Sequence, residues 1–118
     1  MTALLVGLGG VCGVMARYGI GKATFHTEAL MWSTVGINIA GSFLLGLLAA
    51  ETWFSRDVRE ALGVGFLGGF TTFSTFSVQV VLEADGGRPG VALAYVLASV
   101  LGGIAAAWAG YALGRAVA

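Results

Sequence analysis

The residues of this chain best suited to chemistry are concentrated in one run of ten, from Gly68 to Ser77. The run combines two adjacent glycines with five hydroxyl side chains and three phenylalanines, inside a stretch without charge from 61 to 82. Glycine weakens a helix by ~1 kcal/mol and hydroxyls compete for backbone hydrogen bonds, so a continuous lipid-facing helix is disfavoured here. At membrane depth a loosened helix is tolerated only where protein or a water-filled cavity covers it. The pattern therefore predicts an ion or solute site at a helix break in mid-membrane.

The composition indicates a membrane protein. The 118 residues are 58% hydrophobic and 10% charged, with a mean hydropathy of +0.91, whereas a soluble domain carries roughly 25% charged residues. Stretches long enough for the ~20 residues that cross a bilayer as a helix lie at about 2–21, 30–50, 61–82 and 90–114. Only short loops remain between them. We therefore expect a single four-span transmembrane domain over residues 1–118, all α-helical, with its third helix broken.

Charge and cysteine content exclude several functions. The net charge is zero and no basic cluster exists, which argues against a nucleic-acid partner. One cysteine and one histidine provide neither a disulfide framework nor metal-ligand spacing. No combination of nucleophile and base is present inside the spans, so we do not expect an enzyme.

The basic residues are divided almost evenly between the two sides of the predicted membrane. The side with the second loop and the termini carries Arg56, Arg59 and Arg115. The opposite side carries Lys22 and Arg88, and also Arg17 if its side chain reaches outward. The positive-inside rule therefore gives almost no preference for one orientation. Either other cues set one orientation, or the chain inserts both ways and pairs antiparallel about a two-fold axis.

Polar and aromatic side chains in the spans extend the candidate site. Asn38 is an amide inside the second span, where polar groups are rare and usually functional, although a packing hydrogen bond is the alternative. Tyr95 and Ser99 are four residues apart, hence on one helical face, and Phe73 and Phe76 are three apart. A phenylalanine pair is usually core or lipid contact. Its positive ring edges can nevertheless meet a permeating anion without holding it too strongly.

Small residues recur at four-residue spacing in the first and fourth spans. In the first span these are Gly9 and Gly13, and in the fourth span they are Gly102, Ala106, Gly110 and Gly114. Such stripes let helix backbones approach closely in lipid. We expect close helix packing along both.

The run from Gly65 to Ser77 resembles the signature of the CrcB/Fluc family of fluoride channels. Further matches follow in the family's order: Gly9-Gly10 with Arg17-Tyr18, then Asn38 to Phe43, then Tyr95 with Ser99. Together they cover essentially the whole chain. One departure is Gln79, where many family members carry a glutamate.

The resemblance implies a passive fluoride-selective channel that exports fluoride from the cytoplasm, as a multi-pass protein of the cell inner (plasma) membrane. It implies an antiparallel, dual-topology homodimer with two pores; some family members pair as heterodimers, and the small charge bias here favours the homodimer. The implied pore residues are Phe73, Phe76, Asn38, Thr72, Ser74, Tyr95 and Ser99. The resemblance also implies a structural sodium ion on the dimer axis, held by the backbone carbonyls of Gly68 and Thr71 from both subunits.

Two alternatives to a channel are a small multidrug-exporter-like transporter and a passive subunit of a larger membrane assembly. A proton-coupled exporter needs a carboxylate inside a span. The six acidic residues all lie at span ends or in loops: Glu28, Glu51, Asp57, Glu60, Glu83 and Asp85. An assembly subunit would explain the glycine stripes but not a polar, broken third span.

Overall fold

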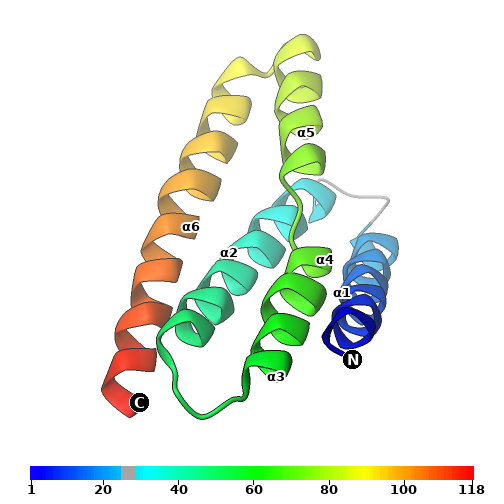
Figure 1. Cartoon of the computed structure of the whole chain (residues 1–118). Coiled ribbons are helices and arrows are strands. Elements are labelled where there is room, and N and C mark those ends of the chain that lie inside the picture. The colour runs from blue at the N-terminus through cyan, green and yellow to red at the C-terminus, as the bar shows by residue number, and fades with distance from the viewer. Residues whose placement is uncertain (25–28) are drawn as a thin grey trace.

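The computed structural model describes residues 1–24 and 29–118, which form an all-helical bundle (Figure 1). The elements are α1 (Thr2–Thr24), α2 (Ala29–Ala50), α3 (Arg56–Glu60), a π-helical stretch (Ala61–Leu67), α4 (Gly68–Phe70), α5 (Phe73–Asp85) and α6 (Pro89–Val117). With the stretch from Arg56 to Asp85 taken as one, four helices in the described residues are long and apolar enough to cross a membrane. The predicted all-α class and the four spans are confirmed.

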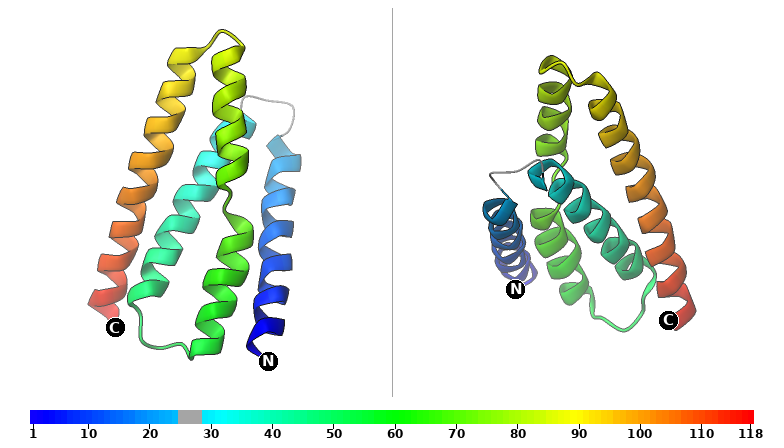
Figure 2. Two further views of the ribbon diagram at one scale, coloured as in Figure 1. Left: turned by 45° about the horizontal axis from the view of Figure 1, so that its top comes forward. Right: turned by 180° about the vertical axis from the view of Figure 1, so that it is seen from behind.

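Both chain ends and the α2–α3 loop lie at one end of the bundle, and the α5–α6 turn lies at the other (Figures 1 and 2). Local chemistry fixes the helix ends. Ser55 caps α3 by accepting a hydrogen bond from the Val58 amide at 3.4 Å. Pro89 begins α6, where its missing N–H costs nothing. Gly87 adopts φ +83° in the turn between α5 and α6, a conformation that glycine reaches without strain.

The glycine stripes lie at the closest helix contacts, as predicted. α6 packs along α2, and a Cβ added to Gly110 would lie 1.9 Å from the Phe43 carbonyl oxygen. α1 packs along the first half of the third span, where a Cβ on Gly13 would lie 2.0 Å from the Phe66 carbonyl oxygen. Neither position has room for a larger side chain, because the contact is with backbone atoms.

The third span is interrupted between α4 and α5. Thr71 (φ −82°, ψ 158°) and Thr72 (φ −152°, ψ 122°) are extended, and the ribbon narrows to a strand-like link at this point (Figure 1). The interruption falls inside the glycine- and hydroxyl-rich run. That it lies at mid-membrane stays a prediction.

The acidic residues that the structure describes lie at helix ends or in loops. Glu51 follows α2 directly and is 1% exposed; its carboxylate accepts hydrogen bonds from the amides of Trp53 (2.7 Å) and Phe54 (3.0 Å). It also lies 3.2 Å from the Arg59 guanidinium. This carboxylate therefore ties the α2–α3 loop together, which gives it a structural role at the bundle end. Glu28 lies outside the described residues.

Candidate functional site

The side chain of Asn38 in α2 forms hydrogen bonds with the backbone of the third span where its helix is interrupted. Its Nδ2 donates to the Thr72 carbonyl oxygen at 2.9 Å, and its Oδ1 accepts from the Thr72 amide at 2.8 Å. Both polar groups of one extended residue are thus satisfied by a single side chain, which removes the large cost of leaving them unpaired in hydrocarbon. The interhelical hydrogen bond considered for Asn38 is present, and an amide nitrogen carries a second proton for another acceptor.

Thr72 in turn starts α5. Its Oγ1 accepts a hydrogen bond from the Thr75 amide at 3.3 Å, and it also donates to the Thr75 hydroxyl at 3.1 Å. Ser74 is exposed, with its hydroxyl 3.5 Å from that of Thr72. The first amides of α5 and the positive end of its dipole therefore meet a group of hydroxyls, which is an arrangement that favours an anion.

Arg17 of α1 reaches the other side of the interruption. Its Nε donates to the Gly69 carbonyl oxygen at 3.2 Å, at the end of α4. The guanidinium there complements the negative end of the α4 helix. From the sequence, Arg17 is expected to extend outward or to stay within the first span, and no role for it is predicted. A charged residue near the end of an otherwise uncharged span is the sequence feature that could have indicated this contact.

A cavity of about 350 Å³ lies between α2, α5 and α6 beside the interruption. Five of the seven predicted pore residues line it: Asn38, Thr72, Phe73, Phe76 and Ser99. Ser74 and Tyr95 do not. Ser42 of α2 is a further polar lining residue that the sequence reasoning did not single out, although it is four residues from Asn38 and so on the same helix face. The buried Ser99 hydroxyl has no hydrogen-bond partner among the described residues.

The aromatic rings form a connected row from the cavity into the core. Phe73 is 80% exposed and Phe76 only 8%, with ring centroids 5.8 Å apart. Behind Phe76 lies Tyr95, whose ring centroid is 5.1 Å away and which is fully buried. Trp32 meets Tyr95 edge to face at 6.0 Å. Tyr95 therefore lies one layer behind the cavity wall.

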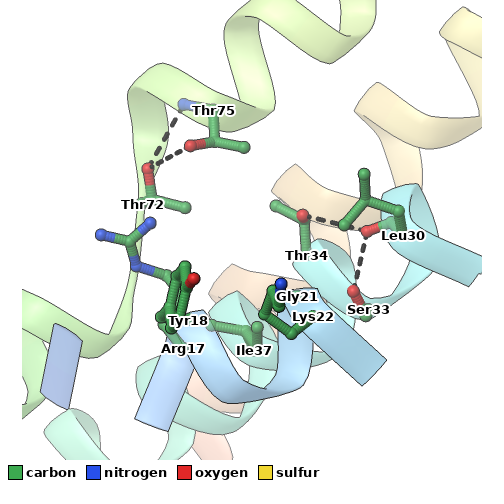
Figure 3. Close-up of a pocket in the computed structure, with 10 residues that line it drawn as sticks. All are labelled: Arg17, Tyr18, Gly21, Lys22, Leu30, Ser33, Thr34, Ile37, Thr72 and Thr75. Carbon is green, nitrogen blue, oxygen red and sulfur yellow. Dashed lines mark hydrogen bonds between the residues drawn. The ribbon is translucent and has the colours of Figure 1, made fainter. Parts of the chain in front are cut away.

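A second cavity, of about 300 Å³, lies on the α1 side of Thr72 (Figure 3). Arg17 and Lys22 of α1 line it together with hydroxyl residues of α2 and α5. Figure 3 shows the Arg17 guanidinium extending toward Thr72. The hydroxyl residues in question are Ser33, Thr34, Thr72 and Thr75. The two positive charges on its wall favour an anion, whereas the Ser33 and Thr34 hydroxyls already donate to the Leu30 carbonyl and the Thr72 hydroxyl to Thr75.

The fold defines a multi-pass membrane protein with a polar cavity beside an interrupted helix. The family model described as "CrcB-like protein, Camphor Resistance (CrcB)" matches residues 4–111, and the chain belongs to this family. The chain is 43% identical to the fluoride-specific ion channel FluC of Thermus thermophilus, over 97% of this chain and 95% of that protein. It is 44% identical to the protein of the same name from Rhodospirillum centenum, over 95% of this chain and 94% of the other.

Replacing Asn38 tests the hydrogen bonds to Thr72. Asn38→Leu leaves the Thr72 amide and carbonyl without partners, at about 1–3 kcal/mol for each group. We expect the midpoint of thermal unfolding in detergent to fall by roughly 5 °C or more. Asn38→Asp keeps the acceptor but loses the donor and adds a negative charge, so we expect it to impair anion flux as well. For the unfolding measurement, Ser42→Ala is the control on the same helix face, and unchanged unfolding of Asn38→Leu would contradict the assignment.

Proposed function

We propose that this chain forms a passive, fluoride-selective channel through which fluoride leaves the cytoplasm. The observation that carries the proposal is the cavity beside the interrupted span, where neutral hydrogen-bond donors and phenylalanine rings come together. The near full-length similarity to proteins named fluoride-specific ion channels supports the choice of ion.

The chemistry of the cavity suits an anion that passes through without being trapped. Its lining residues carry no formal charge. The second Asn38 amide proton, the Ser99 hydroxyl, which is unpartnered among the described residues, and the first amides of α5 offer donors to a partly dehydrated ion. The edges of Phe73 and Phe76 add weak attraction. Conduction needs contacts that are favourable enough for the ion to arrive and weak enough for it to leave.

The second cavity suits a role in collecting anions. Arg17 and Lys22 place two positive charges on its wall, beside Thr72, which lines both cavities. A concave surface of one charge sign raises the local concentration of the opposite ion. We propose that fluoride reaches the region of Thr72 through this basic cavity.

We also propose the structural sodium ion at the end of α4. In a continuous helix the Thr72 amide would bond to the Gly68 carbonyl, and the Thr75 amide to the Thr71 carbonyl. Here these amides donate to the side chains of Asn38 and Thr72 instead. The two carbonyls lose their usual helical donors, and carbonyl oxygens suit a hard cation. Gly68 is exposed on the single chain, which agrees with a site completed by a second subunit.

An antiparallel homodimer is the assembly that we propose. One chain leaves Phe73 80% exposed at the edge of its cavity, so a single copy does not enclose the path. A second copy related by a two-fold axis in the membrane plane would cover both cavities alike and give two pores.

Efflux from liposomes tests the proposed function. Purified protein is reconstituted into liposomes loaded with fluoride or chloride, and release is started with an ionophore that balances charge. We expect rapid loss of fluoride and retention of chloride, without any proton gradient, while protein-free liposomes retain both. Flux that requires a proton gradient would indicate an exporter. Folded protein without fluoride flux would indicate an assembly subunit, and either result would overturn the proposal.

A further inference from the structure

The buried Tyr95 of α6 is bonded through its hydroxyl to Gln79 of α5, beside a second side-chain hydrogen bond with Thr34 of α2. The Tyr95 hydroxyl donates a hydrogen bond to Gln79 Oε1, and Tyr95 itself is 0% exposed. A buried phenol needs a partner for its hydroxyl, because an unpaired buried polar group is costly. The hydrogen bond joins the two helices one layer behind the cavity.

The Tyr95 ring is also the surface against which Phe76 rests. The two ring centroids are 5.1 Å apart with the planes tilted by 47°. On its far side Tyr95 meets Trp32 at 87°, edge to face. Phe76 in turn lies 5.8 Å from Phe73, and both line the cavity. The position of the Tyr95 ring therefore sets the space in which Phe76 can turn.

We infer that Gln79 is a positioning residue for the anion path: by accepting the Tyr95 hydroxyl hydrogen bond, it fixes the ring edge that Phe76 presents to the cavity. This inference rests on the proposed function and deepens it. An aromatic ring attracts an anion at its edge and repels it at its face, so a modest rotation of Phe76 changes the sign of the interaction. Position 79 therefore needs a side chain of this length that carries a hydrogen-bond acceptor. A glutamate has such an acceptor and a methionine does not.

The test compares Gln79→Met, Gln79→Glu, Tyr95→Phe and the double variant Gln79→Met/Tyr95→Phe in the liposome assay. We expect Gln79→Met to lower the ratio of fluoride to chloride flux about tenfold, the scale of one misaligned contact between an ion and a ring. Gln79→Glu should keep most of the selectivity. Val78→Met is the matched control, because its side chain is exposed on the same helix.

Tyr95→Phe removes this hydrogen bond from the other end, together with the one to Thr34, and keeps the ring. It should therefore reproduce the loss seen in Gln79→Met, and the double variant should be no worse than either single variant. This variant also tests the inference if Gln79→Met does not fold. A second measurement uses protein labelled with 3-fluorotyrosine, in which the ¹⁹F resonance of Tyr95 should move in Gln79→Met and stay close to its original position in Gln79→Glu.

The outcomes separate the two proposals. Wild-type protein that carries no selective fluoride flux overturns the proposed function. Selective wild-type flux with an unchanged flux ratio in Gln79→Met overturns the role of Gln79 alone. Equal losses in Gln79→Met and Gln79→Glu, or additive losses in the double variant, also overturn it, because the effect would then not pass through the Tyr95 hydroxyl.

Discussion

Replacing Phe76 with isoleucine is expected to reduce fluoride efflux by about tenfold or more while the protein still folds and assembles. Isoleucine keeps apolar bulk but has no quadrupole, and the analogous contacts of cations with ring faces are worth about 0.5–2 kcal/mol each. A barrier higher by 1.36 kcal/mol corresponds to a tenfold lower rate. Phe76 is buried against Tyr95 with one side on the cavity, so its ring is held where an ion would pass.

Phe73→Ile completes this test. Phe73 lines the same cavity but is 80% exposed on the single chain, so its ring meets the ion only if a second subunit encloses the path. At least one of the two replacements should reduce efflux strongly. Phe54→Ile, in the α2–α3 loop, is the control for loss of a ring elsewhere. Wild-type fluoride efflux in both pore variants would remove the rings from the mechanism.

Locking the orientation of the chain is expected to abolish flux altogether. Ala84→Lys with Asp85→Lys adds positive charge at the α5–α6 turn, and both positions are exposed. The extra charge should hold this turn in the cytoplasm. If the working unit is an antiparallel homodimer, such a chain has no correctly oriented partner. Liposome efflux of the purified variant should then fall to the level of protein-free controls.

A chain locked the opposite way should restore the flux. Ala116→Lys with Ala118→Lys adds two positive charges at the C-terminal end of α6, where both residues are exposed. Each variant alone should be inactive, and the two expressed together should conduct. Terminal tags on the wild-type chain should be accessible from both membrane faces in comparable amounts. A tag on one face only, in active protein made of one chain type, would rule out the antiparallel homodimer.

The number of spans and the place of the interruption could be predicted because both depend on local composition. Apolar length marks each span, and the glycines and hydroxyls from Gly68 to Ser77 mark the weak point of the third. The structure adds length at the helix ends: α1 continues to Thr24 where 21 was expected. Helix ends are the least certain part of such predictions, because polar residues can extend a helix beyond the bilayer.

The contacts that organise the site could not be predicted in the same way. Asn38 meets Thr72 across 34 residues of sequence, and Arg17 meets Gly69 across 52. Such pairs depend on how each helix is rotated about its axis when it packs, which spacing within one helix does not determine. Phe73 and Phe76 illustrate the point. Residues three apart are separated by roughly 60° around a helix, enough to leave one ring exposed and the other buried.

The Asn38 hydrogen bonds also have a consequence for the order in which the protein is made. The partner that allows the Thr72 backbone to leave the helix is carried by α2, which precedes the third span along the chain. During synthesis α2 therefore leaves the ribosome before residues 71 and 72 do. The kinked form of the third span can be adopted as soon as it meets α2, and its backbone need never face lipid unpaired. The sequence order of the spans is thus itself part of how this protein matures.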